Sequence, residues 1–340
     1  MSAPFPKTIG VLGAGVIGLQ TALILKEAGF DVVIVAKDFP GSEDPLYTST
    51  WSGAQWRSNI SIGNQQDWDR QTFQRWSDLV QTTPPETLGL QLYPATYLWD
   101  HSEDSFRPED SHWWTKSFIP DFHVLSSDQV AREGPFAAGM TYQTFAICPT
   151  RYLTYLRNQC AAQGIPCHAG TAAPLSLVLG EGKDRHEIFS MAEFKNVMGI
   201  VNWPNSRGSR TGLATRRGRE GWEALIIPWP GTNMTMLGGC KIPGEWSTQP
   251  DEAITQMILE QCKPLAPELL DANGEFEVRR VRVGLRPARH GGPRMQLERC
   301  PDGRFICHAY GHDSAGYEGS VGIAREILNL VADHVAARGL

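Results

Sequence analysis

TIGVLGAGVIGLQTALILKEAGFDVVIVAKD, residues 8–38, carries the strongest structural signal of the chain. It predicts a strand at residues 8–12, a glycine-rich turn, a helix at residues 19–28 and a second strand at residues 31–35. A glycine-rich turn between a strand and a helix is the context that a dinucleotide fingerprint requires. The pattern therefore predicts a nucleotide-binding βαβ unit at the start of the chain.

The three glycines of this turn have different expected tasks. Gly13 allows the sharp bend, Gly15 lets a pyrophosphate approach the backbone, and Gly18 lets the helix pack against the strand. The helix N-terminus adds unpaired N–H groups that attract an anion. The alternative is that the glycines only shape a turn. We expect cofactor contacts at Gly13, Gly15, Val16, Ile17 and Gly18.

The end of the second strand reads Ala36-Lys37-Asp38. In nucleotide-binding units of this kind, an acidic residue about 20 positions after the glycines binds the ribose hydroxyls. Asp38 follows Gly18 by 20 residues, so we expect it to bind the ribose. Lys37 is expected near a phosphate, and the alternative is a solvated turn residue, because lysine is mostly exposed.

The composition is that of an ordinary folded protein. The 340 residues are enough for two domains, and 41% apolar with 20% charged residues is typical of globular chains. A net charge of −6 gives no basic surface for nucleic acid, which we exclude as a partner. No run of 18 apolar residues occurs, and residues 1–6 lack the features of a signal peptide. We therefore expect no membrane association.

Cysteines and histidines form no metal or disulfide pattern. The seven cysteines are spread without a C-x-x-C pair, which favours free thiols. His308 and His312 are four residues apart, but they lie in a glycine-rich turn where this spacing does not align two ligands. We expect no metal.

A second glycine-bearing turn lies near the other end of the chain. We expect a strand at residues 305–310, the turn at residues 311–320 and a closing helix at residues 321–336. Because this order repeats that of the first unit, both chain ends are expected in one domain, with both helix N-termini directed at one ligand. An interleaved section is expected between them, with strands and a helix at residues 90–99, 139–146 and 151–163.

Two compositional features lie in the middle of the chain. Residues 207–219 contain five arginines, a density typical of an exposed, mobile loop. Most of the eleven tryptophans lie at residues 51–114 and 203–246. We interpret them as packing residues, and an aromatic pocket for a flat cofactor or an apolar substrate is the alternative.

Two C-terminal motifs, supported by the N-terminal glycine turn, resemble signature segments of the D-amino-acid oxidase family, above all of its fungal members. The motifs are VGLRPAR at residues 283–289 with GGPR at 291–294, HAYG at 308–311 with SAGY at 314–317, and VLGAGVIGL at 11–19. The glycine turn is shared with many flavoproteins, whereas the C-terminal motifs are specific. Weaker similarity spans most of the remaining chain, with a gap near residues 180–222.

The resemblance implies an α/β fold, in which a Rossmann-like FAD-binding domain is interleaved with a mixed-sheet substrate domain. The chain would cross between the two domains several times. The FAD-binding domain is expected at residues 1–65, 145–195 and 280–340. The substrate-binding domain is expected at residues 66–144 and 196–279.

The resemblance also implies a function. Non-covalently bound FAD would oxidise a D-amino acid by hydride transfer from Cα to flavin N5, giving an imino acid and, after reoxidation by molecular oxygen, hydrogen peroxide. Arg286 matches the arginine that binds the substrate carboxylate, and a guanidinium suits a two-bond grip that lysine does not reproduce. Ser314 matches the turn that faces the substrate amine and the flavin. These two residues are the expected catalytic pair.

Further contacts follow from the same resemblance. Beyond the first glycine turn, the FAD contacts are expected at Lys37, Asp38, Thr48, Ser49, Gly53, Ala54, Ser314, Ala315, Gly316, Tyr317 and Glu318. The substrate pocket is expected to include Gln55, Trp222, Leu225, Arg286 and Ser314. Glu318 matches a position at the pyrimidine edge of the flavin, and a charge beside a helix N-terminus is its alternative.

The chain departs from the family pattern in two places. The family has a tyrosine just before the Ile-Ile-Pro run, where this chain has Leu225, and another a few residues upstream, where none stands here. The family segment that touches the cofactor is unrecognisable after residue 202. The alternatives are a flavin-dependent tailoring enzyme for a different amine or amino-acid-derived substrate, or a non-catalytic relative. An acidic or unusual substrate could be gripped by Arg216, Arg217 or Arg219.

The expected partners are a small amino-acid or amine substrate and molecular oxygen, and a homodimer is compatible with the sequence. Residues 338–340 read RGL, which is not the S-K-L peroxisomal signal. We therefore expect a cytoplasmic protein, with a peroxisomal location as the alternative.

Overall fold

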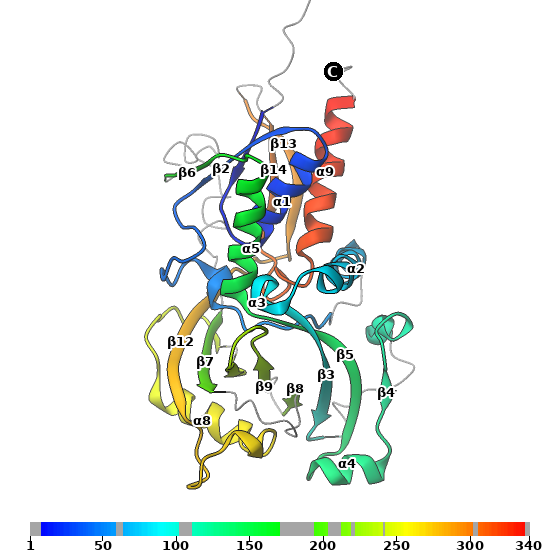
Figure 1. The fold of residues 1–340 in the computed structure, drawn as a ribbon, viewed down its shortest axis with the longest axis vertical. Coiled ribbons are helices and arrows are strands. Elements are labelled where there is room, and N and C mark those ends of the chain that lie inside the picture. The colour runs from blue at the N-terminus through cyan, green and yellow to red at the C-terminus, as the bar shows by residue number, and fades with distance from the viewer. Residues whose placement is uncertain are drawn as a thin grey trace, which may run out of the picture.

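The computed structural model describes residues 8–58, 64–101, 111–170, 194–202, 212–218, 222–240, 242–301 and 305–336. Two bodies lie one above the other in the view of Figure 1. The upper body holds a small parallel sheet and long helices, and the lower body holds a large curved sheet. Of the five arginines expected in a loop, Arg207, Arg210 and Arg219 lie outside the described residues.

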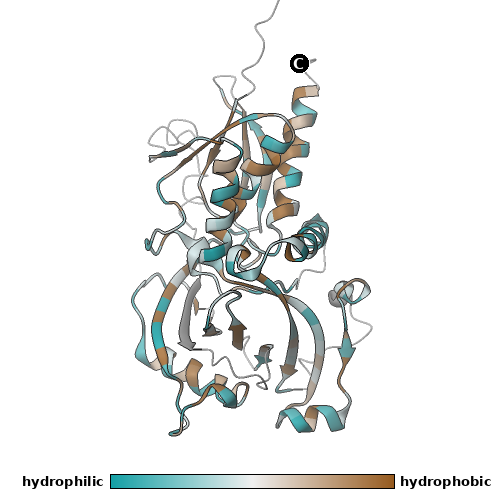
Figure 2. Ribbon diagram, viewed as in Figure 1, coloured by the Kyte–Doolittle hydropathy of each residue, from teal (hydrophilic) through white to brown (hydrophobic). Residues whose placement is uncertain are grey.

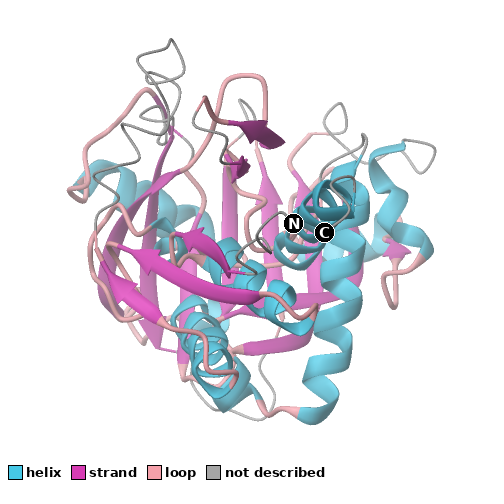
Figure 3. Ribbon diagram, turned by 90° about the horizontal axis from the view of Figure 1, so that it is seen from above, coloured by secondary structure: helices cyan, strands magenta, loops and turns pink. Residues whose placement is uncertain are grey.

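The upper body begins with the predicted βαβ unit. Strands β1 (Thr8–Leu12) and β2 (Asp31–Ala36) pair in parallel, and β6 (Cys167–Ala169) extends the sheet beside β2. Helix α1 (Val16–Glu27) contacts both α5 (Pro149–Ala162) and α9 (Ser320–Ala336). Since α9 closes the described chain, both chain ends share one body, as the sequence predicts. Seen from above, helices flank the strands (Figure 3).

Two further elements complete this body. Strands β13 (Arg294–Arg299) and β14 (Phe305–Tyr310) form an antiparallel pair that contacts α9. Helix α2 (Asn64–Thr82) also packs on α9, where Trp68 contacts Ile323 and Ile327. Residues 66–82 therefore pack with the nucleotide side of the molecule, whereas the sequence placed them in the substrate domain.

The lower body is a mixed nine-stranded sheet in the order β11-β7-β10-β9-β8-β3-β5-β4, with β12 also paired to β7. All pairs are antiparallel except β3 with β8. The strands are β3 (Leu90–Trp99), β4 (His123–Val124), β5 (Ala138–Ile147), β7 (Phe194–Asn202), β8 (Leu213–Arg217), β9 (Glu223–Pro228), β10 (Met234–Gly238), β11 (Ile242–Pro243) and β12 (Val278–Arg286). Shorter elements are η1 (Thr48–Trp51), α3 (Pro85–Leu88), η3 (Ser111–Ser117), α4 (Ser127–Glu133) and η5 (Pro267–Leu269).

Two sequence expectations change in this sheet. Residues 280–286 were expected in the FAD-binding domain, but they belong to β12 and pair with β7. Residues 213–217 were expected in a mobile arginine loop, but they form β8 between β3 and β9, with Leu213 and Thr215 buried. We keep the two-domain division as a proposal, with α2 moved to the FAD-binding domain and β12 to the substrate domain.

The large sheet has two chemically different faces. Its outer face packs against α8 (Glu252–Cys262), where alternate strand residues such as Ile226, Leu237 and Val283 join an apolar cluster. The colours of β12 accordingly alternate between hydrophilic and hydrophobic in Figure 2. The opposite face, called the inner face below, receives residues 51–57 from the upper body.

Most tryptophans of the described residues are buried against other side chains. Trp56 and Trp76 are fully buried, with exposed fractions of 1% and 0%. Both rings make edge-on contacts with phenylalanines, Trp56 with Phe73 and Trp76 with Phe145. The packing interpretation is therefore confirmed for the buried tryptophans, whereas Trp246 is 50% exposed and Trp203 lies outside the described residues.

All seven cysteines are free thiols, as the sequence predicts. In the part of the chain that the structure describes, no group of three or more metal-ligating side chains gathers. None of the described helices combines the length and apolar character needed to cross a bilayer.

Candidate active site

The first glycine turn has the close packing that its sequence predicts. Gly13 has φ +100°, a left-handed conformation that favours glycine. A Cβ atom on Gly18 would lie 2.1 Å from the Gly13 carbonyl oxygen. Helix α1 therefore sits directly on the turn, and only glycine fits at position 18.

Ser49 lies at the N-terminus of α1. Its hydroxyl accepts a hydrogen bond from the Val16 N–H group at 3.1 Å, and a Cβ atom on Gly15 would lie 2.8 Å from this oxygen. The hydroxyl of Tyr317 donates to the Ser49 carbonyl oxygen at 2.7 Å. Tyr47 similarly donates to the Ala14 carbonyl oxygen at 2.6 Å. Residues from three distant parts of the chain thus meet where the helix dipole is positive.

This arrangement suits a phosphate group. The N–H groups of Ile17 and Gly18 enter none of the hydrogen bonds described for this part of the chain. The Ser49 hydroxyl and these N–H groups can together donate to phosphate oxygens at a helix N-terminus. Thr48 is adjacent, although its hydroxyl points to the Leu46 carbonyl oxygen at 3.4 Å.

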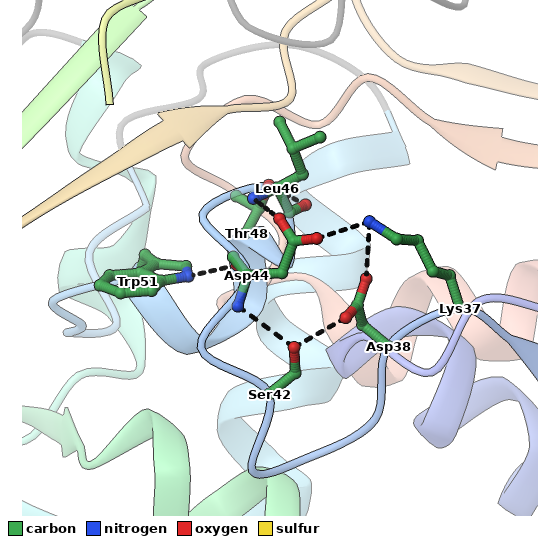
Figure 4. A network of polar contacts seen from close by, with 7 residues as sticks. All are labelled: Lys37, Asp38, Ser42, Asp44, Leu46, Thr48 and Trp51. Carbon is green, nitrogen blue, oxygen red and sulfur yellow. Dashed lines mark hydrogen bonds and ion pairs between the residues drawn. The ribbon is translucent and has the colours of Figure 1, made fainter. Parts of the chain in front are cut away.

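Figure 4 shows that Lys37 and Asp38 belong to a network with Ser42 and Asp44. The Lys37 ammonium lies 2.5 Å from Asp44 Oδ2 and 3.7 Å from Asp38 Oδ2, and its hydrogen bond lowers the pKa of Asp44. Ser42 donates to Asp38 at 2.7 Å. The structure thus pairs Lys37 with two carboxylates instead of leaving it for a phosphate. Asp38 keeps 19% of its side chain exposed, and its ribose contact stays a proposal.

The C-terminal turn joins the end of β12 to the start of α1. Ala288 forms a bridge with His312, and the Asp313 N–H group donates to the Pro287 carbonyl oxygen at 3.1 Å. A Cβ atom on Gly316 would lie 4.0 Å from Ile17. The expected turn residues Ser314, Ala315, Gly316 and Tyr317 are therefore held between the strand that ends in Arg286 and helix α1.

The N-terminus of α9 was expected to be directed at a ligand, but it packs against α2. The Thr72 hydroxyl oxygen, on α2, accepts hydrogen bonds from the N–H groups of Val321 at 3.1 Å and Gly322 at 3.4 Å. A Cβ atom on Gly322 would lie 2.0 Å from Trp68 Cα, so α2 crosses α9 in direct backbone contact. The first N–H groups of α9 are thus capped by α2 and are not left free for a ligand, unlike those at the start of α1.

Strand register defines the inner face. Thr215 is opposite both Leu225 and Tyr97, and residues directly opposite in a sheet share a face. Gln55 reaches this face and its amide nitrogen lies 3.4 Å from the Thr215 hydroxyl. Side chains two positions apart along a strand also share a face, which adds Glu223 beside Leu225.

Arg286 lies on the inner face as well. In β12, Arg282 lies over the Trp51 ring at 5.2 Å, and a Cβ atom on Gly284 would lie 2.5 Å from Trp51 Cβ. Arg286 follows by the same alternation, beyond Trp51 and beside the C-terminal turn. Its Nε atom is buried and has no hydrogen-bond partner among the described residues. A buried, unpartnered guanidinium nitrogen is costly unless a ligand supplies an acceptor.

Gly53 and Ala54 connect the two bodies. The Ala54 N–H and carbonyl groups exchange hydrogen bonds with Ile147, at 3.3 and 2.9 Å. The Trp229 indole N–H donates to the Gly53 carbonyl oxygen. A Cβ atom on Gly53 would lie 2.6 Å from the end of the Met236 side chain. The backbone before Gln55 is thus fixed against the large sheet.

Trp222 and Arg216 are not brought to the inner face. Arg216 pairs with both oxygens of Asp100, at 2.8 and 3.1 Å, and its guanidinium lies 5.5 Å from the Trp222 ring centroid. Trp222 packs with the apolar cluster that faces α8. The structure therefore places Trp222 away from the other expected pocket residues. Arg216 is already paired with the carboxylate of Asp100 and is not available for a substrate anion.

Three inner-face residues were missed in the sequence. Arg57 donates to Glu223 Oε2 at 2.7 Å, and the Tyr97 hydroxyl donates to Glu223 Oε1 at 3.1 Å. The Arg57 guanidinium also lies over the Tyr97 ring at 5.3 Å. Burial opposes ionisation of Glu223, but Arg57 outweighs it and lowers the pKa of this carboxyl.

Comparison with known proteins agrees with this geometry. The family model of the DAO group, described as FAD dependent oxidoreductase, matches residues 8–183 and 194–330. The chain belongs to this family. It is therefore an FAD-dependent oxidoreductase with the DAO fold, and FAD is its cofactor.

Relatives and solved structures extend the comparison. The chain is 28% identical to a D-amino-acid oxidase of Fusarium vanettenii, with 95% of this chain and 96% of the relative covered. It is 29% identical to a D-aspartate oxidase of Talaromyces thermophilus, with 96% and 95% covered. The fold is similar to that of glycine oxidase from Bacillus cereus ATCC 14579, with TM-score 0.70, 16% identity, and 96% and 94% of the chains covered.

The residues at the first turn fit FAD. The close approach at Gly15, the Ser49 hydroxyl and the open N-terminus of α1 suit its pyrophosphate. Residues 51–57 connect this turn to the inner face, where Gln55 and Arg57 contact the large sheet.

Proposed function

We propose that this protein oxidises D-amino acids to imino acids and produces hydrogen peroxide. When bound, FAD supplies the acceptor for the Cα hydride and returns the electrons to molecular oxygen. The position of Arg286 carries the proposal, because its buried, unpartnered Nε atom lies at the end of β12 beside the Ser314 turn. A guanidinium there can fix a carboxylate by two hydrogen bonds and orient the substrate Cα–H bond.

The other expected residues would contact either FAD or the substrate. The first glycine turn and Ser49 would bind the FAD phosphates, and Asp38 the ribose. Gly53 and Ala54 would lie along the flavin, with Ser314 and Glu318 at the C-terminal turn. Gln55 and Leu225 share the inner face with Arg286 and would line the substrate pocket.

The charged side chains on the inner face support a narrower class of substrate. Arg217 interacts with Tyr97 and Glu223, and Arg282 adds another cation on the same face of β12 as Arg286. Glu223 is already paired with Arg57. This excess of positive charge favours D-amino acids with an acidic side chain, and one relative is named a D-aspartate oxidase.

Replacement of Arg286 tests the proposal. We expect Arg286→Ala to lower kcat/KM for D-amino acids by roughly 30- to 1,000-fold, because about 2 to 4 kcal/mol of charged hydrogen bonding is lost. Arg286→Lys should recover only part of this loss, since lysine cannot form the two-bond grip. Arg279→Ala is the matched control, because Arg279 is exposed on the same strand and pairs with Glu277.

The assay also decides between the alternatives. Peroxide formation and anaerobic bleaching of the oxidised flavin band are measured with acidic and neutral D-amino acids. Bleaching by either class supports amino-acid oxidation, and a higher kcat/KM for the acidic class supports the narrower proposal. A flavin band that no D-amino acid bleaches favours a tailoring enzyme or a non-catalytic relative. Undiminished kcat/KM in Arg286→Ala would remove the reason for choosing carboxylate substrates.

A further inference from the structure

Arg57 is hydrogen-bonded to carboxyl groups from two different segments. Its guanidinium donates to Glu223 at 2.7 Å, and its backbone N–H group donates to Glu318 Oε2 at 3.2 Å. Glu318 precedes α9 and has an exposed fraction of 8%. The cation of Arg57 is thus taken by Glu223, and Glu318 receives only a neutral N–H donor.

Asp69, on α2, is the third carboxyl group. It is 1% exposed, and the Ser58 hydroxyl donates to its Oδ2 atom at 2.5 Å. Its other oxygen lies beside the backbone next to Glu318, because a Cβ atom on Gly319 would be 3.2 Å from Asp69 Oδ1. Asp69 and Glu318 are therefore neighbouring buried carboxyl groups.

The two groups have no cation of their own among the described salt bridges. A buried carboxylate without a counter-ion is expensive, and two that face each other do not both ionise near neutral pH. Burial, and then the charge of Asp69, raise the pKa of Glu318 well above its ordinary value. Burial also raises the pKa of Asp69 to about 7, although Ser58 opposes this change.

We propose that Asp69 and Glu318 hold one proton between them, and that Glu318 uses it to donate a hydrogen bond to bound FAD. Asp69 is a positioning residue here, because it acts on the flavin through Glu318. The inference rests on the proposed placement of the flavin at the C-terminal turn. A neutral Glu318 presents a donor, whereas an ionised one would present only acceptors.

The charged and titratable groups around Glu318 come from several elements. Asp69 faces it from α2, Arg57 from the preceding loop, Asp313 from its own turn and Tyr142 from β5. Arg57 lowers and Asp313 raises the pKa of Glu318, and Glu223 acts on the group through its pairing with Arg57. The folded-state pKa of Glu318 lies above that of an unfolded chain, so the proton is present at low pH and is lost as pH rises through the folded value.

FAD affinity as a function of pH tests the proposal. The dissociation constant of FAD from the full chain is measured by flavin fluorescence between about pH 6 and pH 9, where most other groups keep their charge. We expect it to rise about tenfold per pH unit above the pKa of the pair, because one proton is linked to binding. Glu318→Gln should bind FAD with no such pH dependence, since its amide donates without titrating. Asp67→Asn, an exposed change on the same helix, should behave like the wild type.

Infrared spectroscopy gives a second readout without FAD. At about pH 8, above the pKa of Asp69, the wild-type full chain should show the carbonyl stretch of a buried protonated carboxylic acid, and in Glu318→Gln this band should be much weaker. A pH-independent dissociation constant in the wild type, or an unchanged pH dependence in Glu318→Gln, overturns the proposal. If Glu318→Gln does not fold, Asp69→Asn decides. Removal of the neighbouring charge should move the rise in the dissociation constant to lower pH, and an unmoved profile overturns the proposal.

Neither measurement uses a substrate. Failure of the shared proton therefore leaves the D-amino-acid oxidase proposal intact. Conversely, a chain that oxidises no D-amino acid can still bind FAD in the pH-dependent manner expected here.

Discussion

His312 shows, at the scale of one residue, how the site changes a titrating group. Its ring is 5% exposed and meets the edge of Trp68 at a centroid distance of 6.0 Å. Its Nε2 atom is buried without a hydrogen-bond partner in the described part of the chain. Desolvation therefore lowers the pKa of His312 to about 4.

The lowered pKa of His312 makes the free energy of unfolding depend on pH. The unfolded chain, with a histidine pKa of about 6.5, takes up a proton before the folded chain does. The free energy of unfolding should therefore fall as pH drops from about 6.5 towards 4, by about 2 kcal/mol at pH 5. We expect His312→Phe to remove this part of the pH dependence, measured by urea unfolding at pH 7 and pH 5. His168→Phe, at an exposed position of β6, is the control and should keep it.

Single residues differ in how far the sequence predicts them. Gly13 and Gly18 were predictable because their task is set by neighbours a few positions away. Arg57, Glu223 and Tyr97 were not, because their contacts join residues 126 and 166 positions apart. A local pattern carries no signal of such pairs, and an arginine beside Trp56 reads like any surface residue.

The N-terminus of helix α9 is capped by a side chain of another helix. Ser320 begins it, yet the hydroxyl oxygen that satisfies the first free N–H groups belongs to Thr72 of α2. Such groups need an acceptor when they are buried, because water cannot reach them. The contact makes α2 and α9 one structural unit.

Removal of this acceptor should destabilise the unit. Thr72→Val keeps the shape but leaves the N–H groups of Val321 and Gly322 without a partner, which costs about 1 to 3 kcal/mol of unfolding free energy. Thr154→Val is the control, because Thr154 is an exposed threonine on α5 whose hydroxyl bonds within its own helix. Faster amide hydrogen exchange at residues 321 and 322 should accompany the loss. Equal destabilisation by both changes would argue against the cap.

Elements with a strong local period were predicted well. The βαβ unit and the long strands β3 and β5 have apolar patterns that are complete within each segment. Strand β8 was not predicted, because its arginines look like those of a loop. The sheet accommodates them: Arg216 pairs with Asp100, and the neighbours β3 and β9 supply the hydrogen bonds. Tertiary pairing overrides composition here.

At the scale of the whole molecule, residues 51–57 join the two bodies. Arg57 belongs to the segment that follows the nucleotide turn, and Glu223 belongs to the large sheet. Their ion pair is mostly withdrawn from solvent, with side-chain exposures of 14% and 20%. A pair in this position fixes the large sheet relative to the segment that follows the first glycine turn.

Removing one partner of this ion pair should lower the free energy of unfolding more than removing both partners. Arg57→Met removes the ion-pair partner of the buried Glu223 carboxylate and leaves it with Tyr97 and the weaker influence of Arg217, so we expect the free energy of unfolding to fall by about 3 to 5 kcal/mol. The double variant Arg57→Met, Glu223→Met should recover much of this loss, as read from a double-mutant cycle of urea unfolding. Lys263→Met, which breaks outer pairs with Glu260 and Glu275, should lower the free energy of unfolding far less, because solvent screens these pairs. Additive losses in the double variant would contradict the coupling.

The contact of α9 with α1 and α2 has a consequence during synthesis. The first glycine turn is translated long before α9, the helix that packs on α1. A nascent chain therefore holds a half-covered nucleotide fold while the entire sheet is translated. Stable FAD binding is therefore expected only after α9 has been translated, so a shortage of FAD should leave an apoprotein that contains α9 and not a fragment that stops before it.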